Sequence, residues 1–250
     1  ARGGLHGLLG SNGCGKTSIL NAIVRLIPHD GVIRVDGRRT DTFSRKLLAR
    51  HIAYMRQQQH HHFDLSVAEV VALGQYAHGG VDLEKIESVL DESDLLELKY
   101  RPMTELSGGQ RQRVFYAKTL AQESQLILID EGLSNADIYY QLKFLEALKR
   151  KTREEGKTVL MVLHDLQLAQ QFCDDLTVLH AGSLHQSGPA DEVMTDAMIH
   201  RGPDSWGYAF GDSSGVRPVA IVHGGDSAPD GFDFALGHRP DAGGIAEGVA

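Results

Sequence analysis

The feature that most constrains the fold of this 250-residue chain is a glycine-rich segment near its N-terminus. The segment has the P-loop pattern G-x-x-x-x-G-K-S/T and consists of Gly10, Ser11, Asn12, Gly13, Cys14, Gly15, Lys16 and Thr17. A short apolar run ending at Leu9 precedes it, and apolar residues at helical spacing follow it until Pro28. Strand, glycine-rich loop and helix are the context that this motif requires. The sequence therefore predicts a phosphate-binding loop within an α/β fold.

The chemistry of the loop follows from its residue types. Its glycines allow the backbone to curl so that consecutive N–H groups point at a phosphate chain, and the helix that follows adds its positive end. Lys16 supplies a charge for the β- and γ-phosphates, and the hydroxyl of Thr17 can ligate Mg²⁺. We include the next residue, Ser18, in the predicted nucleotide site. Cys14 is interpreted as merely small, but we expect its thiol to be open to solvent and to react faster than that of Cys173.

Composition excludes several other classes of protein. The length predicts one domain with a core, and no apolar run approaches the ~20 residues of a membrane span. No signal peptide is visible, and two cysteines do not make a disulfide framework, which favours a reducing compartment. The formal net charge of −8 argues against a nucleic-acid surface. Because Gly10 lies so close to Ala1, we expect the chain to be cut at its N-terminus.

Further elements follow from hydrophobic periodicity and turn residues. The pattern predicts a strand and turn over residues 31–37, and a short helix near 44–50 that leads into a strand ending before Gln57. A mostly helical region follows, in which Ser66 caps one helix and another covers about 83–90. Two buried strands at 125–129 and 158–163 and a hairpin over 174–186 complete the pattern, with a helix between the two buried strands.

The segment Leu106–Gln110 has the sequence LSGGQ, and it starts a helix. Ser107 and Gln110 have the spacing of a capping box, and Gly108 and Gly109 expose backbone N–H groups that can approach an anion closely. Taken alone, the segment is equally well explained as a capped helix that binds nothing.

Two strand ends carry candidate catalytic groups. Asp130 and Glu131 directly follow the apolar strand at 125–129, at the edge of a parallel sheet where ligands bind. A carboxylate there can hold Mg²⁺, and its neighbour can orient or deprotonate an attacking water. A lone histidine at a strand end is more often structural, but His164 follows a second buried strand and can reach the same edge.

Together these segments resemble the ATPase subunit of an ABC transporter. The resemblance covers Walker A at the P-loop, Gln57 in the Q-loop, the LSGGQ signature, Walker B ending at Asp130, Asp137 in the D-loop and His164 as the switch histidine. It implies a P-loop NTPase (RecA-like) core with a mostly parallel sheet, a helical signature subdomain at about residues 58–122 and a truncated antiparallel β subdomain. This domain is expected to span residues 1–200.

The resemblance also implies roles, cofactors and partners. ATP and Mg²⁺ are the implied ligands; Glu131, His164 and Gln57 are implied to be catalytic, and Thr17, Gln57 and Asp130 to organise the metal. In a homodimer, the partner protomer would complete each ATP site with Ser107, Gly108, Gly109, Gln110 and Asp137. Integral membrane permease subunits would hold the protein at the cytoplasmic face of the inner (plasma) membrane, and a periplasmic or surface substrate-binding protein would act indirectly. The segments SVAEVVALGQYAH and VLHDLQLA resemble importers of ferric siderophores, haem and vitamin B12.

Two alternatives remain at this point. One is a soluble ABC-type ATPase that acts on DNA or ribosomes; the net charge, the single P-loop and the short interval between Gln57 and Leu106, without a coiled coil, disfavour it. The other is an inactive fragment, since the adenine-stacking aromatic residue of the family would lie upstream of Ala1. Gly132 stands where the family has proline, which makes the D-loop geometry less certain.

Two segments fall outside these motifs. His60, His61 and His62 are adjacent, whereas metal ligands are usually spaced, so a solvated loop is the preferred interpretation. Residues 201–250 contain 11 Gly, 4 Pro and no Lys, which predicts a poorly ordered tail. Within it, MTDAMIHRGPDSWGYAF resembles a fragment of the amidotransferase domain of asparagine synthetases, whereas RPVAIVHGG resembles the closing strand of siderophore-type ATPases.

Overall fold

The computed structural model describes residues 3–56, 64–131, 138–194, 220–223 and 233–236. Its centre is a six-stranded sheet in the order β4-β5-β6-β1-β7-β8. The strands are β1 (Leu5–Gly10), β4 (Ile52–Met55), β5 (Leu126–Ile129), β6 (Thr158–Val162), β7 (Asp175–His180) and β8 (Ser183–Pro189). All neighbours are parallel except β7 and β8, which form the predicted hairpin. Every residue of β5 and β6 is buried, as their uninterrupted apolar sequences predict for inner parallel strands.

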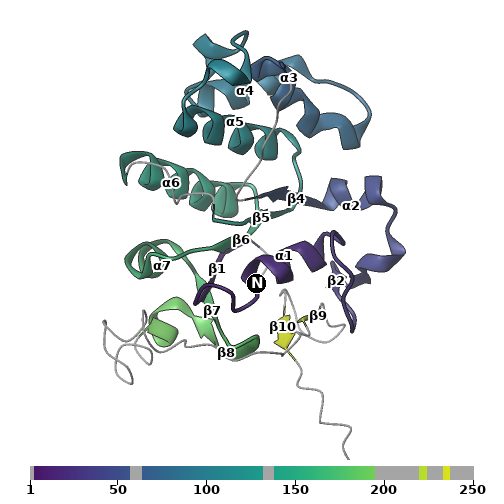
Figure 1. The fold of residues 1–250 in the computed structure, drawn as a ribbon, viewed down its shortest axis with the longest axis vertical. Helices are drawn as coiled ribbons and strands as arrows, with labels where there is room; N and C mark the ends of the chain where they lie inside the picture. The colour runs from purple at the N-terminus through teal and green to yellow at the C-terminus, as the bar shows by residue number, and fades with distance from the viewer. Residues whose placement is uncertain (1–2, 57–63, 132–137, 195–219, 224–232, 237–250) are drawn as a thin grey trace, which may run out of the picture.

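Helices cover both faces of this sheet (Figure 1). One face carries α1 (Lys16–Ile23) and α2 (Arg45–His51), and the other carries α6 (Ile138–Glu154) and α7 (Leu166–Phe172). Alternation along β5 separates the two cores: Leu128 belongs to the cluster of α1, and Ile129 belongs to the cluster of α6. This three-layer arrangement confirms the predicted α/β fold with a mostly parallel sheet.

A helical layer lies beyond one end of the sheet, at the top of Figure 1. It contains α3 (Val67–Ala72), α4 (Leu83–Glu92), α5 (Gly108–Ala121) and three 3₁₀ segments, η2 (Leu73–His78), η3 (Leu96–Leu98) and η4 (Met103–Glu105). Gly74 allows η2 to approach α5 closely, because a Cβ at this position would lie 2.2 Å from the carbonyl oxygen of Lys118. The prediction of a mostly helical segment here is confirmed for residues 64–122.

The first helix is shorter than its apolar pattern predicts. It ends at Ile23, and Arg25 adopts a positive φ of 59°, whereas the pattern predicts a helix up to Pro28. The guanidinium of Arg25 donates to the carbonyl oxygen of Phe43 at 2.7 Å, which ties the turn to the segment before α2. Leu26 and Ile27 continue the apolar pattern, but they lie beyond the turn and are exposed.

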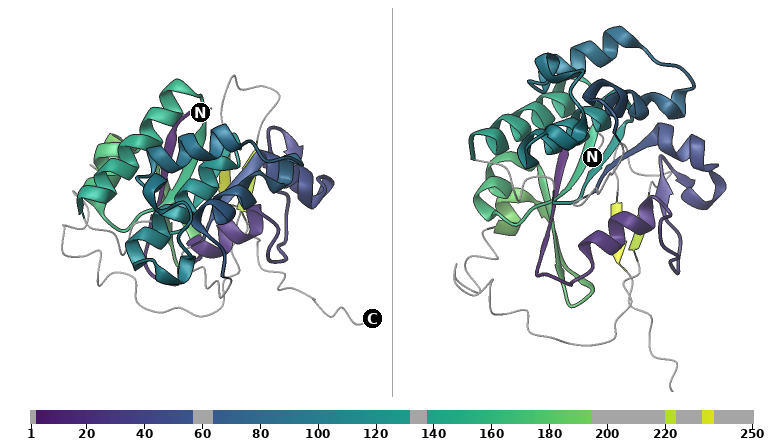
Figure 2. Two further views of the ribbon diagram at one scale, coloured as in Figure 1. Left: turned by 90° about the horizontal axis from the view of Figure 1, so that it is seen from above. Right: turned by 45° about the horizontal axis from the view of Figure 1, so that its top comes forward.

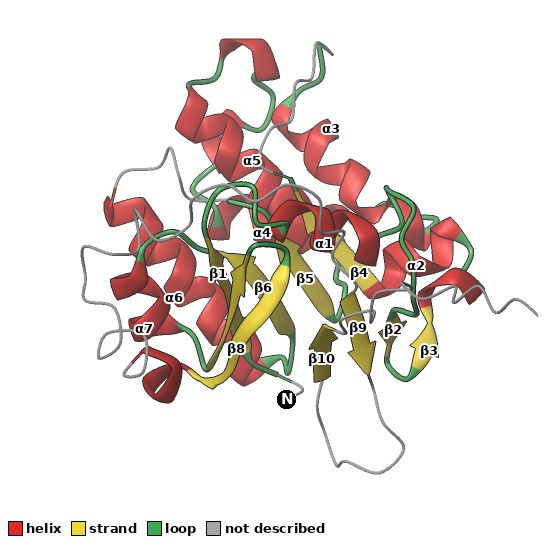
Figure 3. Ribbon diagram, turned by 60° about the horizontal axis from the view of Figure 1, so that its bottom comes forward, coloured by secondary structure: helices red, strands yellow, loops and turns green. Residues whose placement is uncertain are grey.

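Two small antiparallel sheets lie beside α1. The first pairs β2 (Arg34–Val35) with β3 (Arg38–Arg39) and is followed by η1 (Thr40–Thr42); the second pairs β9 (Ala220–His223) with β10 (Asp233–Leu236). Figures 2 and 3 show β9 next to β2, far from it in sequence. The described part of the C-terminal segment therefore contains a strand pair where the composition predicts poor order. Its strand β9 falls in the segment that resembles a closing strand, while the amidotransferase-like stretch lies outside the described residues after Met194.

Candidate functional site

The strands that carry the predicted site residues end at the same edge of the sheet. In the parallel register, Leu8 of β1 is level with Val162 of β6, and Met161 of β6 is level with Ile129 of β5. The residues that follow these strands, from Gly10, Asp130 and Leu163 onward, therefore emerge together. This edge is where open α/β sheets bind their ligands.

The P-loop adopts the curled backbone that its sequence predicts. Gly10, Gly13 and Gly15 have positive φ angles of 147°, 78° and 105°. A Cβ at Gly10 would lie 2.5 Å from the carbonyl oxygen of Leu179, so only glycine fits between this loop and β7. Gly15 is the N-cap of α1 and provides no side chain to cap it, so no side chain competes there for the helix N-terminus.

Lys16 is held inside the loop. Its ammonium group donates to the carbonyl oxygens of Gly10 and Ser11 at 2.8 and 2.9 Å, and only 5% of the residue is exposed. The neighbouring Thr17 and Ser18 are exposed. The cation is thus fixed at the concave side of a backbone curl, which suits it to phosphate oxygens.

Thr17 and Asp130 form a hydrogen-bonded pair at the end of β5. The hydroxyl of Thr17 donates to Oδ1 of Asp130 at 3.0 Å, and Asp130 is almost fully buried. Burial raises the pKa of the Asp130 carboxyl above its ordinary value, and the charge of Glu131 acts in the same direction, against hydrogen bonds from Thr17 and Tyr54. A hydroxyl and a carboxylate oxygen are hard ligands of the kind that Mg²⁺ takes, so these two residues fit a magnesium site.

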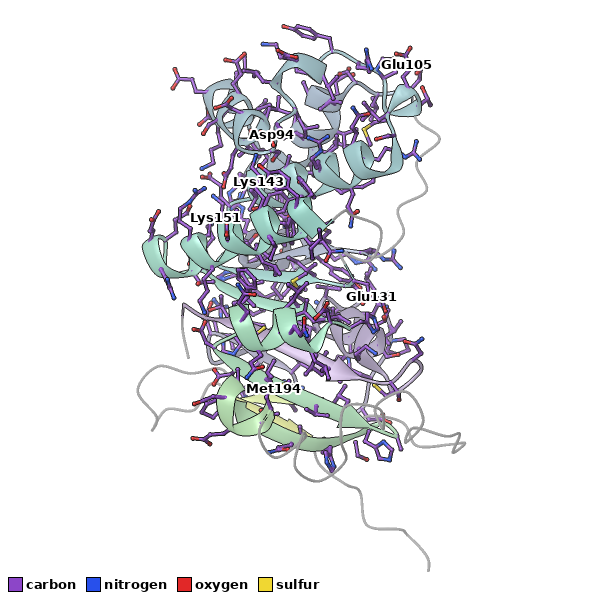
Figure 4. The ribbon with its side chains drawn as sticks, turned by 90° about the vertical axis from the view of Figure 1, so that its left-hand side faces the viewer. Asp94, Glu105, Glu131, Lys143, Lys151 and Met194 are labelled. Carbon is purple, nitrogen blue, oxygen red and sulfur yellow. The ribbon has the colours of Figure 1, made fainter. Side chains whose placement is uncertain are left out.

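Glu131 and His164 are brought together across the same edge. Nε2 of His164 lies 2.7 Å from Oε1 of Glu131, and because a carboxylate only accepts, the histidine nitrogen carries the proton. Glu131 has a φ of 51°, which is uncommon for a residue with a side chain and costs about 1–3 kcal/mol where the surroundings impose it. Figure 4 labels Glu131 at the level of the sheet, on the opposite side of that view from Lys151.

Two further residues lie at this edge, Tyr54 and Asn21, and no sequence motif predicts either of them. The hydroxyl of Tyr54 lies 3.2 Å from Oδ1 of Asn21 and 3.4 Å from Oδ2 of Asp130. Burial raises the pKa of Tyr54 well above its ordinary value, and the charge of Asp130 raises it further. Alternation along β4 was the available signal, because Tyr54 shares the α1 side of the sheet with Ile52.

The LSGGQ segment starts α5 with the predicted capping box. The Gln110 N–H donates to Oγ of Ser107 at 3.2 Å, and the Ser107 N–H donates to Oε1 of Gln110 at 2.9 Å. A Cβ on Gly108 or Gly109 would meet no atom within 4 Å, so packing within the chain does not require glycine at either position. Both glycines are exposed, which leaves the start of α5 open to an external partner.

The two halves of the predicted nucleotide site lie in different layers of this chain. Figures 1 and 2 show α5 in the helical layer and α1, which follows the P-loop, on the sheet. The P-loop, Asp130, Glu131 and His164 are brought together, and the Ser107 segment belongs to the other layer. Gln57, Asp137 and the histidines at 60–62 lie outside the described residues.

The expectation that Cys14 is open to solvent is wrong. Only 4% of Cys14 is exposed, and its Sγ points at Gly10, lying 2.7 Å from where a Cβ would stand there. The Cys14 N–H donates to the carbonyl oxygen of Ser11 at 3.3 Å. Cys173 is 7% exposed, and burial raises the pKa of its thiol to about 12. Exposure therefore does not favour the reaction of Cys14 over that of Cys173.

Two other kinds of feature are absent from the described residues. No group of three or more His, Cys, Asp or Glu side chains in the described ranges could hold a metal ion. Among the same residues, no helix has both the length and the apolar composition needed to cross a bilayer.

Comparison with known proteins gives consistent results. Residues 1–134 match the model of the ABC transporter family. The iron(3+)-hydroxamate import ATP-binding protein FhuC of Bacillus subtilis (strain 168) is 37% identical over 206 residues, which cover 79% of this chain and 77% of that protein. The ferric enterobactin transport ATP-binding protein FepC of Escherichia coli (strain K12) is 34% identical over 202 residues, 78% of this chain and 74% of its own. The cobalamin import ATP-binding protein BtuD of Halobacterium salinarum (strain ATCC 29341 / DSM 671 / R1) is 32% identical over 248 residues, 90% of this chain and 62% of its own.

Solved structures show the same architecture. The dimeric structure of MJ0796, a bacterial ABC transporter cassette, superimposes with a TM-score of 0.70 at 27% identity, covering 76% of this chain and 87% of that one. The ATP-binding subunit of an ABC transporter superimposes with a TM-score of 0.71 at 25% identity, covering 79% and 83%.

Proposed function

Because the chain belongs to the ATP-binding subunits of the ABC transporter family, we propose that it is the ATP-hydrolysing motor subunit of an importer for an iron complex, such as a ferric siderophore or haem, or for vitamin B12. The observation that carries the proposal is the convergence of the Thr17–Asp130 pair and the Glu131–His164 pair beside the P-loop. One pair suits a metal ion and the other suits proton transfer, and both are needed for phosphoanhydride hydrolysis.

ATP binding begins with the P-loop. Lys16 can exchange the carbonyl oxygens of Gly10 and Ser11 for phosphate oxygens, because a charged acceptor makes the stronger hydrogen bond with an ammonium group. The N-terminus of α1 faces the same anion and favours its negative charge. When bound, Mg²⁺ would be held by Thr17 and Asp130, with Gln57 as a further proposed ligand, and would neutralise phosphate charge.

Hydrolysis then depends on Glu131 and His164. Glu131 is proposed to orient the attacking water and accept its proton. His164 donates its Nε2–H to Glu131 in this structure, and one N–H serves one strong acceptor at a time. We infer that His164 releases Glu131 when it turns to the γ-phosphate, which frees the carboxylate for the water.

The open start of α5 supports a split site. Ser107, Gly108, Gly109 and Gln110 lie in the helical layer of their own chain, and a second copy placed head to tail can bring them to the γ-phosphate. Asp137 is proposed to line the same interface. The dimeric structure of the related cassette supports this arrangement for a homodimer.

The proposed partners follow from the relatives. Several are named import ATP-binding proteins, for iron(3+)-hydroxamate and for cobalamin among others. We propose that the helical layer docks on integral permease subunits at the cytoplasmic face of the inner membrane, and that a periplasmic or surface substrate-binding protein delivers the cargo without touching this chain.

The function is tested by uptake in cells that carry the natural gene. Cells with the Lys16→Ala or the Glu131→Gln allele should fail to accumulate one labelled cargo. The cargoes to be compared are ⁵⁵Fe, supplied as a siderophore or haem complex, and ⁵⁷Co-cobalamin. Cells with a Lys46→Ala allele should accumulate that cargo normally. Lys46 is a suitable control because its side chain is exposed on α2. If the alleles inactivate ATP hydrolysis but uptake of every labelled cargo is unchanged, the import function is contradicted. A role on DNA or ribosomes then becomes the better explanation.

A further inference from the structure

We infer that Tyr54, supported by Asn21, is a positioning residue that fixes the carboxylate of Asp130 for the metal of the MgATP complex. The inference rests on the proposed function, because it assigns Asp130 to that metal. The residues come from three elements: Asn21 from α1, Tyr54 from β4, and Asp130 from the end of β5.

The strand register places Tyr54 correctly for this role. Tyr54 is level with Leu128 in the parallel β4–β5 pair, and the Asp130 N–H continues the ladder by donating to the carbonyl oxygen of Met55 at 2.9 Å. Tyr54, Leu128 and Asp130 therefore share the side of the sheet that faces α1. A phenol is long enough to span the diagonal from Leu128 to Asp130, whereas a shorter side chain at residue 54 would not reach.

The carboxylate of Asp130 is then held at both oxygens. Oδ1 accepts from Thr17 at 3.0 Å, and Oδ2 lies 3.4 Å from the hydroxyl of Tyr54. Thr17 is itself a proposed metal ligand, so its hydroxyl would contact the metal as well as Asp130 when the metal binds. Tyr54 is not a proposed ligand, so its hydrogen bond can hold the plane of the Asp130 carboxylate both before and after the metal binds.

Asn21 completes the donor arrangement. The single O–H of Tyr54 has two oxygen neighbours, Asn21 Oδ1 at 3.2 Å and Asp130 Oδ2. In this structure Oδ1 of Asn21 accepts from the phenol; turning the amide over lets Nδ2–H donate to the phenol oxygen, so that the phenol proton goes to Asp130. The side chain of Arg56 also hydrogen-bonds the phenol. Asn21 lies one helical turn after Thr17 on α1, which places the two residues on the same side of that helix.

The test compares Tyr54→Phe with unchanged Tyr54, both in a Glu131→Gln background so that ATP is not consumed. Mn²⁺ serves as the probe, and its binding to the ATP-loaded protein is followed by electron paramagnetic resonance. Tyr54→Phe should weaken Mn²⁺ binding roughly tenfold, the lower end of the cost of losing an outer hydrogen bond at a metal site. ATP affinity in EDTA should not change. The control is Tyr100→Phe, since Tyr100 is 79% exposed in the helical layer.

The Mg²⁺ dependence of hydrolysis and the Mn²⁺ affinity of Asn21 variants provide two further tests. In a protein that keeps Glu131, Tyr54→Phe should raise the Mg²⁺ concentration that gives half-maximal hydrolysis by about tenfold. The kcat at saturating Mg²⁺ should stay within about twofold of the value with Tyr54. Asn21→Leu should weaken Mn²⁺ binding less than Tyr54→Phe does. The double variant should bind Mn²⁺ as tightly as Tyr54→Phe, because both changes interrupt the same hydrogen-bonded chain from Asn21 through Tyr54 to Asp130.

Equal Mn²⁺ affinity with and without the phenol hydroxyl overturns the inference, and so does a loss of ATP affinity in EDTA. If the protein with unchanged Tyr54 binds neither ATP nor Mn²⁺, the proposed function fails instead.

Discussion

Glu131 combines strained backbone with a short hydrogen bond to His164. Its φ is 51°, and Oε1 lies 2.7 Å from Nε2 of His164. Replacing it with glutamine keeps the size of the side chain and removes the base. Glu131→Gln should therefore reduce phosphate release by about 100-fold or more and leave the binding of a fluorescent ATP analogue nearly unchanged. Glu97→Gln, at an exposed position in η3, should change neither. Hydrolysis near the unsubstituted rate would show that Glu131 is not the base.

A substitution of Lys16 tests whether the P-loop binds the phosphates of ATP. Its ammonium group is buried in the loop, so Lys16→Ala removes a charge that solvent does not replace. ATP affinity of the monomer should fall by about 10- to 100-fold, the value of one or two charge-assisted hydrogen bonds. Lys46→Ala, which removes an exposed charge, should bind ATP normally. Circular dichroism should be recorded for both variants, because a misfolded loop would lose affinity for a different reason.

At the scale of elements, two helices begin with the same capping box, which gives a matched pair of variants. Ser107 caps α5 and Ser66 caps α3, each with an acceptor three residues later. An arginine at either position should cost about 1 kcal/mol of stability through the lost cap. Only Ser107→Arg should abolish ATP-dependent dimerisation and turnover, because only α5 starts at the proposed interface. Equal loss of dimer in both variants would contradict the split site.

Asp174 links β1 of the sheet to α6, and its contacts predict a pH dependence of stability. Oδ2 accepts from the Leu5 N–H at 2.8 Å, and Oδ1 accepts from Lys149 of α6 at 2.5 Å. Partial burial raises the pKa of this carboxyl, but the bonds from Lys149 and Leu5 outweigh it, so the pKa lies below the ordinary value of 3.8. The stability contribution is therefore complete above pH 3.8 and is lost as the pH falls from there through the lowered pKa.

Asp174→Asn should accordingly lower stability at pH 7 by about 1 kcal/mol, a value discounted for partial exposure, and the melting temperature by about 3 °C. The difference from the unsubstituted protein should shrink as the pH falls below the ordinary carboxyl range. Thermal unfolding followed by circular dichroism over a pH series measures it. Asp91→Asn, at an exposed position on α4, should show no such trend. A difference that grows toward low pH would contradict the assigned sign.

At the scale of the whole molecule, the chain is expected to work as a pair. With MgATP, Glu131→Gln protein should elute at twice the monomer mass, because the closed dimer cannot hydrolyse its ATP and reopen. With ADP it should remain a monomer. Size-exclusion chromatography with light scattering distinguishes these outcomes, and a monomer under both conditions, with ATP binding demonstrated, would contradict the proposed dimer.

The helical layer is joined to α6, the helix on the neighbouring face of the sheet, by ion pairs as well as by the apolar core. Asp94 pairs with Lys143, and Glu92 pairs with Arg150 and Lys151 of α6. Figure 4 shows Asp94 and Lys143 next to each other between the two layers, with Lys151 farther along α6. Most of these side chains are exposed, so each pair contributes little stability, and the buried contacts between α5, α6 and β5 hold the layers together.

The sequence by itself determined the features that depend on residues close together in the chain. The curl of the P-loop follows from its glycines, the starts of α3 and α5 follow from Ser66 and Ser107, and the inner strands follow from apolar runs that end at Asp130 and His164. Each of these is a hydrogen-bonding or steric pattern complete within a few residues. The resemblance of these motifs to a known family also predicted the fold class correctly.

Only the tertiary structure decided the features that need partners far away in the sequence. The early end of α1 involves Arg25 and Phe43, and Cys14 is buried in a cluster that includes the distant Leu179 of β7. The strand β9 lies next to β2 although nearly 200 residues separate them. Tyr54 reaches Asp130 because two strands far apart in the chain pair in one register. The alternation of β4 tells which side of the sheet Tyr54 occupies, but it does not tell which strand lies next to it. That neighbour is decided by the free energy of the assembled sheet and its helices, to which no short segment contributes alone.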